Sequence, residues 1–315
     1  MTSLKTFKKE IEREFENNNI DKSEVNILFC EALNCSQAQL FSKDEISFWQ
    51  KRLIKKFAKK RLKGMPIQSI FKKAYFFGNV FFVNSNVLCP RPETELLVEE
   101  CLKSVKDDCK ILDLCTGSGC IAISLKKELL KQQKNCDVFA SDISSKALAV
   151  AKKNAKKLGA DVVFLKSDMF EKFEKNLKKY QKNAKKTDIF DKNEQKNSKK
   201  SKKTIPQKFD IIVSNPPYIK TKDISFLDAE VKNYDPIISL DGGIDGLDFY
   251  RIIAENASKF LSKNGKIFLE VGIGEVQDVV NLLAQKGFDC FIKKDYNNIE
   301  RIVVGELLWL KNVTK

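Results

Sequence analysis

Four residues at positions 215–218 indicate the chemistry of this chain. They read Asn-Pro-Pro-Tyr and follow an apolar segment, 209–214, that is typical of a buried strand. Two prolines stiffen the turn, so the Asn215 side-chain oxygen and the Pro216 carbonyl are held where both can accept hydrogens of one planar NH2 group. Tyr218 can stack on that plane. Such a site orients a weakly nucleophilic nitrogen toward an electrophile without an ionisable base.

The composition agrees with a mechanism that needs no imidazole. The chain has 315 residues and no histidine, which excludes Ser-His-Asp triads, Cys-His pairs and His-zinc sites. Its nine cysteines form no Cys-x-x-Cys pair, so we expect no metal site and a reducing, cytoplasmic compartment. No apolar run is long enough for a signal peptide or a membrane span, so no membrane partner is expected.

A second group of residues is typical of a cofactor site. A predicted strand, 110–114, runs directly into Cys115, Thr116, Gly117, Ser118 and Gly119, and a helix follows. Glycines at such a turn let a ligand approach the backbone and the N–H groups at the start of the helix. A tight turn without a ligand is the alternative interpretation.

Acidic residues end the next two predicted strands. Asp142 follows the second strand, where a carboxylate holds a ribose diol in such folds, although a helix N-cap role is the alternative. Asp168 and Met169 follow the third strand and are placed to flank an adenine. An ordinary core position is the alternative for Met169.

Alternating strands and helices must position these residues. Strands are predicted at 110–114, 136–141, 162–166, 209–214 and 266–271, with two later ones near 288–293 and 301–309. Helices are predicted near 119–131, 145–158, 246–261 and 275–286. The fold class is therefore α/β, a doubly wound sheet with a parallel core.

The chain divides into three parts on the same reasoning. Residues 1–72 have the apolar spacing of several helices and predict a small helical domain. Residues 73–95 predict a β-hairpin linker that turns at Gly78-Asn79, and 96–315 hold the α/β domain with a helix from Leu96 to about Val105.

One Lys-rich segment accounts for most of the basic charge. The whole chain carries +15, and residues 171–208 alone hold 14 Lys and 5 acidic residues. We interpret about 174–207 as a solvated, partly disordered insertion, with an electrostatic arm as the alternative. The basic charge is thus weak evidence for a nucleic-acid partner, and no stable nucleic-acid binding is expected.

The motifs together resemble a known family. The chain resembles the peptide chain release factor N(5)-glutamine methyltransferases, which are S-adenosylmethionine-dependent class I methyltransferases with an NPPY motif. The resemblance covers nearly the whole chain outside the Lys-rich segment. It is carried by PRPETELLVE (90–99), DLCTGSG (113–119), SDMF (167–170), SNPPYI (214–219), LDGGIDGLDFYRII (240–253) and LEVGIGEVQ (269–277).

The resemblance implies a role for each matching position. Cys115 to Gly119 line the methionine part of S-adenosylmethionine, Asp142 holds its ribose, Met169 lies beside its adenine with Asp168, and Asn215 contacts cofactor and substrate. Asn215, Pro216, Pro217 and Tyr218 bind the substrate glutamine, with Asn215, Pro216 and Tyr218 as the catalytic set. Relatives usually have glycine at 115 and often tryptophan at 169, so those two contacts differ here.

The resemblance also implies the reaction and the partner. The methyl group passes to the side-chain amide nitrogen of the glutamine in the Gly-Gly-Gln (GGQ) motif of class I release factors, which leaves S-adenosyl-L-homocysteine. The enzyme is expected to be a monomer, with the helical domain docking the release factor. A ribosomal-protein glutamine methyltransferase and a DNA or RNA adenine-N6 methyltransferase are the alternatives.

Overall fold

The computed structural model describes residues 2–187 and 204–308. Its centre is a seven-stranded sheet in the order β10-β11-β9-β8-β5-β6-β7. The strands are β5 (Lys110–Leu114), β6 (Asp137–Asp142), β7 (Val162–Lys166), β8 (Phe209–Ser214), β9 (Leu261–Glu270), β10 (Phe288–Lys294) and β11 (Glu300–Leu307). Strands β5 to β9 are parallel, while β11 is antiparallel to both of its neighbours. The predicted α/β sheet with a parallel core is confirmed.

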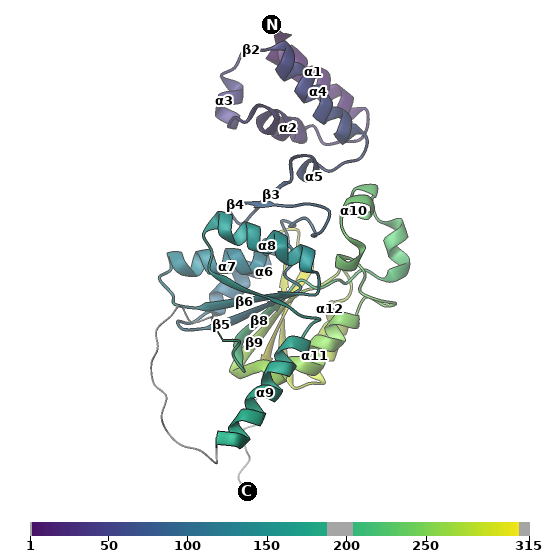
Figure 1. Cartoon of the computed structure of the whole chain (residues 1–315). Coiled ribbons are helices and arrows are strands. Elements are labelled where there is room, and N and C mark those ends of the chain that lie inside the picture. The colour runs from purple at the N-terminus through teal and green to yellow at the C-terminus, as the bar shows by residue number, and fades with distance from the viewer. Residues whose placement is uncertain (1, 188–203, 309–315) are drawn as a thin grey trace.

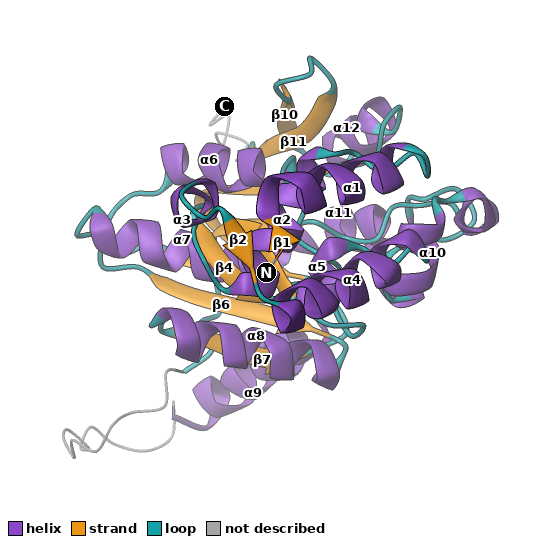
Figure 2. Cartoon of the chain, turned by 90° about the horizontal axis from the view of Figure 1, so that it is seen from above, coloured by secondary structure: helices purple, strands orange, loops and turns teal. Residues whose placement is uncertain are grey.

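Helices cover both faces of this sheet, as Figures 1 and 2 show. They are α6 (Thr94–Ser104), α7 (Cys120–Lys131), α8 (Ser145–Leu158), α9 (Glu171–Thr187), α11 (Asp248–Phe260) and α12 (Val276–Ala284). The segment between β8 and α11 contains α10 (Ala229–Tyr234) and the short 3₁₀ turns η1 (Thr221–Phe226) and η2 (Ile237–Ser239). The predicted helices are thus present, and their ends shift by at most two residues.

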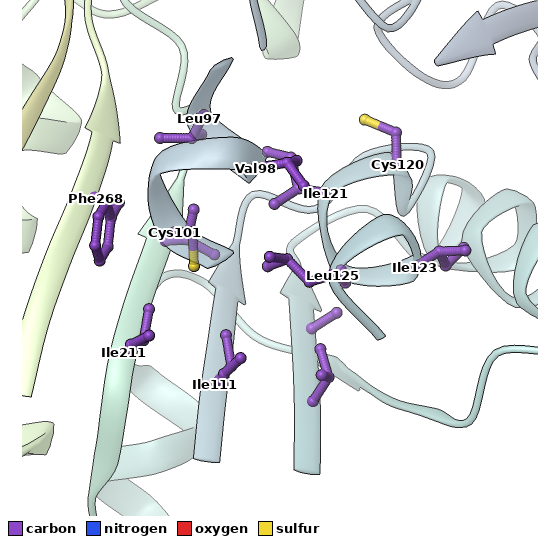
Figure 3. Packing of buried hydrophobic residues seen from close by; sticks show 14 of the residues in the cluster. Leu97, Val98, Cys101, Ile111, Cys120, Ile121, Ile123, Leu125, Ile211 and Phe268 are labelled. Carbon is purple, nitrogen blue, oxygen red and sulfur yellow. The ribbon is translucent and has the colours of Figure 1, made fainter. Parts of the chain in front are cut away.

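The central strands are apolar on both faces because each face has its own core. On one face, α6 and α7 pack over Ile111, Ile211 and Phe268, as Figure 3 shows. On the other, α11, α12 and the start of α9 form a second core that contains Tyr250 and Phe260. Burial on both faces explains why these strands read as continuous apolar runs.

The N-terminal helices form a separate core at one end of the molecule (Figure 1). They are α1 (Leu4–Glu16), α2 (Ser23–Leu33), α3 (Gln37–Phe41), α4 (Phe48–Leu62) and α5 (Ile67–Phe71), with a short pairing of β1 (Thr2–Ser3) and β2 (Glu45–Ile46). Arg61 of α4 binds Glu24 through two hydrogen bonds of 2.5 and 3.0 Å, and also lies 2.6 Å from Glu230 of α10. This arginine therefore ties the helical segment to the segment that follows β8.

A two-stranded hairpin, β3 (Lys73–Phe76) and β4 (Asn79–Phe82), follows. Its turn is Phe77-Gly78, one residue earlier than the predicted Gly78-Asn79. Both turn residues have positive φ, 47° and 67°, which is the geometry of a type I′ turn. The prediction was wrong because Phe77 adopts a conformation that its residue type disfavours, which leaves Asn79 to pair with Phe76.

The Lys-rich segment differs from the expectation at its beginning. Residues 171–187 form helix α9 rather than an irregular solvated stretch. Phe170, Phe173 and Leu177 make an apolar stripe that packs on the second core, so this part buries more area than its composition suggested. Asn176 Nδ2 donates to the Ile205 carbonyl at 3.1 Å and joins the two ends of the segment. Residues 188–203 lie outside the described part of the chain.

Candidate active site

The site lies where the strand order reverses, between β5 and β8. The carboxyl ends of these parallel strands lie side by side, and the Ser214 hydroxyl donates to the Leu114 carbonyl at 2.8 Å. This contact brings the loop 115–119 next to 215–218. Ligands bind at such switch points in open α/β sheets.

The buried Asp113 side chain holds the loop 115–119 in place through hydrogen bonds. Its Oδ2 accepts hydrogen bonds from the Thr116 hydroxyl at 2.6 Å and from the Ala122 N–H at 3.2 Å. Burial raises the pKa of the Asp113 carboxyl to about 7, against the lowering effect of those two donors. Gly119 has φ of 81°, and a Cβ there would lie 2.9 Å from Ile123, so only glycine fits this turn.

Asn154 of α8 fastens the same loop to the hairpin. Its Nδ2 donates to the carbonyls of Ser118 and Phe82, both at 2.9 Å, and its Oδ1 accepts from the Phe82 N–H at 2.7 Å. The side chain is fully buried. Nothing in the sequence points to this role, because an asparagine inside an amphipathic helix carries no signal for such distant partners.

Asp142 lies at the end of β6, beside the loop. Its Oδ2 accepts from the Gly117 N–H at 2.9 Å and its Oδ1 from the Ser144 N–H at 2.8 Å. Ser144 itself caps α8, so Asp142 is not the cap. Each carboxylate oxygen keeps a free lone pair for a ligand. Burial raises the pKa of Asp142, and the two backbone donors oppose that effect.

A cavity of about 510 Å³ opens at this edge of the sheet. Its wall includes the hydrophobic side chains Val87, Ile238, Phe249 and Ile252 and seven of the predicted site residues. The seven are Cys115, Gly117, Asp142, Asp168, Met169, Asn215 and Pro217, whereas Pro216 and Tyr218 lie outside the lining. Thr116, Ser118 and Gly119 do not line it and instead hold the loop in shape.

Cys115 and Met169 meet in the cavity wall. The Cys115 sulfur lies 3.7 Å from the Met169 sulfur, and both residues have positive φ, 59° and 38°. The Ser167 hydroxyl fixes this turn by donating to the Met169 carbonyl at 2.8 Å. The two positions at which the chain departs from the usual family residues therefore contact each other.

Asn215 faces the cavity, and its amide is held from behind. The Asn215 Nδ2 donates to the hydroxyl of Thr94, the first residue of α6, at 3.2 Å. This bond leaves the Asn215 Oδ1 as an acceptor. Pro216 is buried, and the Tyr218 ring packs on the second core, where burial raises the pKa of its hydroxyl.

The glycine-rich loop 240–248 supports the backbone around Tyr218. The Ile219 N–H donates to the Leu240 carbonyl at 2.9 Å, and the Gly242 N–H returns a bond of 2.8 Å to the Ile219 carbonyl. A Cβ on Gly242 would lie 2.7 Å from the Tyr218 Cα, and one on Gly246 would lie 2.5 Å from the Tyr218 carbonyl oxygen. These close approaches explain the glycines of the LDGGIDG stretch.

Comparison with known proteins agrees with this geometry. A family model described as "Methyltransferase domain" matches residues 105–271, and one described as "PrmC N-terminal domain" matches residues 8–71. The protein of Thermodesulfovibrio yellowstonii named release factor glutamine methyltransferase is 37% identical over 289 residues, which cover 89% of this chain and 91% of that protein. This chain belongs to the release factor glutamine methyltransferase family.

A second relative supports the same assignment. The release factor glutamine methyltransferase of Bacillus cereus is 33% identical over 299 residues, covering 92% of this chain and 94% of that protein. This member of the family is therefore an enzyme that transfers a methyl group, and its fold implies the use of S-adenosylmethionine. Among residues 2–187 and 204–308, no helix is long and apolar enough to cross a membrane.

The electrostatics of the enzyme's cavity fit that cofactor. Four aspartates line it, and the described part of the wall includes no lysine or arginine. S-adenosylmethionine has a sulfonium and an ammonium, both of which a negative lining stabilises. A phosphate backbone would meet repulsion in the same cavity. The four are Asp142, Asp168, Asp241 and Asp248.

Two residues behind Asn215 were not among the predicted site residues. They are Thr94, within the quoted PRPETELLVE stretch, and Glu270, within LEVGIGEVQ. Both side chains are almost completely buried. For Glu270 a signal existed, since an acidic residue at the end of a buried strand needs an explanation, but nothing in the local sequence points to Thr94.

Proposed function

We propose that this enzyme methylates the side-chain amide nitrogen of the glutamine in the GGQ motif of class I peptide chain release factors. The observation that carries the proposal is the position of Asn215, which shares one cavity wall with Asp142 while Thr94 holds its Nδ2. An amide acceptor beside a cofactor cavity suits a planar NH2 substrate. The names of the relatives supply the substrate class.

The residues of the cavity fit S-adenosylmethionine. Asp142 would hold the ribose hydroxyls, the backbone of Cys115 and Gly117 would border the methionine part, and Met169 with Asp168 would flank the adenine. Bound there, S-adenosylmethionine would supply its methyl group as the electrophile.

The chain's own contribution to the rate would be alignment and charge stabilisation. The Asn215 Oδ1 and the Pro216 carbonyl would accept the two amide hydrogens, Pro217 would stiffen the turn, and Tyr218 would border the amide plane. These hydrogen bonds strengthen as the nitrogen gains positive charge while its bond to the methyl carbon forms and the carbon–sulfur bond breaks. The amide proton then leaves to water.

The division of labour along the chain is part of the same proposal. Residues 1–72 would dock the release factor, 73–95 would connect, and 96–315 would carry out the transfer. Family precedent supports a cytoplasmic monomer that meets its protein substrate transiently.

The test is transfer of tritiated methyl to purified release factor, ribosomes and nucleic acid, assayed side by side. We expect label only on the release factor, and none when the glutamine of its GGQ motif is replaced by alanine. Asn215→Ala should abolish the transfer and leave the cofactor Kd within a few-fold. Label on nucleic acid or on a ribosomal protein, or near-normal activity of Asn215→Ala, would show the proposal to be wrong.

A further inference from the structure

A buried carboxylate lies behind the catalytic asparagine and has no role in the mechanism above. Glu270 ends β9, is 1% exposed, and neither of its side-chain oxygens has a hydrogen-bond partner among the described residues. It does not line the cavity, and the mechanism above gives it no contact with cofactor or substrate. An ionisable group buried without a partner is costly, which calls for a functional explanation.

Thr94 connects this carboxylate to Asn215. The Thr94 hydroxyl accepts the bond from the Asn215 Nδ2 at 3.2 Å, which leaves its own hydrogen to donate elsewhere. Ser214 pairs with Leu269 in the neighbouring parallel strands β8 and β9, so the residues that follow them, Asn215 and Glu270, lie side by side. The side chains of Thr94 and Asn215 both lower the pKa of Glu270. The hydroxyl and the amide thus both adjoin the buried carboxylate.

We propose that Glu270 acts through Thr94 as a positioning residue that sets which end of the Asn215 amide faces the substrate. The proposal rests on the proposed function, which makes the Asn215 oxygen the acceptor for the substrate NH2. An ionised carboxylate only accepts, so it draws the Thr94 hydrogen toward itself. The Thr94 oxygen then accepts from the Asn215 NH2, and the Asn215 oxygen points toward the substrate.

Protonation of Glu270 reverses the direction of the hydrogen bonds between Glu270, Thr94 and Asn215. A neutral carboxyl can donate to the Thr94 oxygen, which frees the Thr94 hydrogen for the Asn215 oxygen. The amide would then turn its NH2 toward the substrate NH2, and two donors would face each other. The arrangement therefore favours catalysis only while Glu270 is ionised.

The charges around Glu270 decide where this change occurs. Burial is the main reason that the pKa of Glu270 is raised to about 7; the Thr94 and Asn215 side chains and Arg301 on β11 oppose the rise, and Glu93 at the start of α6 adds to it. Tyr218, Tyr250 and Cys120 also face the carboxylate, and each remains neutral because its own pKa is raised. The ionised fraction of Glu270 thus grows as the pH rises through about 7.

The test compares variants at saturating cofactor and release factor between pH 6 and 8.5. We expect the wild-type kcat to rise through pH 7. Glu270→Gln keeps the shape but can donate like the neutral carboxyl, so its kcat should fall about 10–100-fold and lose the rise at pH 7. The cofactor Kd and the KM for release factor should change less than threefold. Thr94→Val should match Glu270→Gln, and Thr94→Ser should restore most of the rate.

A double variant and a matched carboxyl separate positioning from simple packing. Thr94→Val with Glu270→Gln should cost no more than either change alone, since both break the same connection. Glu275→Gln removes another carboxyl whose pKa burial raises to about 7, and the rise of kcat at pH 7 should survive it. Additive losses, or a Glu270→Gln enzyme with unchanged kcat and pH profile, would overturn the inference.

A readout without turnover distinguishes failure of this inference from failure of the proposed function. In ¹⁵N-labelled protein, the Asn215 side-chain NH2 resonance, assigned by its loss in Asn215→Ala, should shift with a midpoint near pH 7. The shift should vanish in Glu270→Gln and in Thr94→Val. A wild-type enzyme that shows this shift but methylates no release factor would refute the proposed substrate alone, whereas the absence of a shift would refute the role of Glu270.

Discussion

Gly246→Ala and Gly274→Ala form a matched pair that tests how the glycine-rich loop supports the reaction motif. Both glycines have the same backbone conformation, with φ of 85° and 83°. A Cβ at 246 would lie 2.5 Å from the Tyr218 carbonyl oxygen and 2.5 Å from the Glu275 carboxylate, while one at 274 would meet nothing within 4 Å. The two changes therefore share backbone strain and differ only in the steric clash.

The magnitudes follow from those two contributions. Alanine at positive φ costs about 1–2 kcal/mol of folding free energy at either position. At 246 the added methyl group must also displace the Tyr218 backbone, which costs about 1–3 kcal/mol more. Because the displaced Tyr218 backbone lies next to the proposed site of the substrate amide, its movement should lower kcat by about 10–100-fold. Gly274→Ala should keep near-normal kcat.

Urea unfolding and methyl transfer to release factor measure the two effects separately. We expect Gly246→Ala to unfold at lower urea than Gly274→Ala and to lose kcat at unchanged cofactor affinity. If the two variants have the same stability and the same kcat, the close packing on Tyr218 does not position the motif and the reasoning fails.

Three further outcomes are expected. Asp142→Asn should weaken S-adenosylmethionine binding at least tenfold by calorimetry, because an amide accepts at only one atom, and an unchanged Kd would remove Asp142 from the ribose site. Arg61→Ala should lower the free energy of unfolding by about 2–4 kcal/mol, since the arginine is buried between two carboxylates, whereas Lys55→Ala breaks a half-exposed pair and should cost under about 1 kcal/mol; equal losses would contradict this assignment. The folded-state pKa of Glu270 is raised to about 7, so its stabilising contribution is complete below its unfolded pKa and is lost as the pH rises through 7. The gain in stability of Glu270→Gln over wild type should therefore be larger at pH 8 than at pH 5.5 in urea melts, and a variant less stable than wild type at pH 8 would contradict the burial argument.

The sequence predicts the parts of the site that follow from local pattern. Strands 110–114, 162–166 and 209–214 have the predicted bounds, because continuous apolar runs with flanking turn residues leave little freedom. Parallel strands place their carboxyl ends on one edge, so Asp142 and Asn215 could be expected in one cavity before any coordinates.

What the sequence could not predict depends on distant packing. Thr94 and Asn215 are 121 residues apart, and Asn154 meets Phe82 across 72 residues. Neither contact leaves a local signal. The hairpin turn lies one residue before the predicted position because Phe77 adopts a positive φ. The start of α9 is helical because Phe173 and Leu177 pack on the second core, although the segment is rich in lysine.

The buried groups behind the cavity explain how a chain without histidine can control an amide nitrogen. The residues of the wall provide acceptors and shape, but an asparagine amide has two ends that differ little in size, so packing alone cannot choose between them. A charge can choose, because an ionised carboxylate only accepts hydrogen bonds. Keeping the ionised Glu270 buried lowers stability. A cost of that kind persists at functional sites when the orientation it maintains is needed for the reaction.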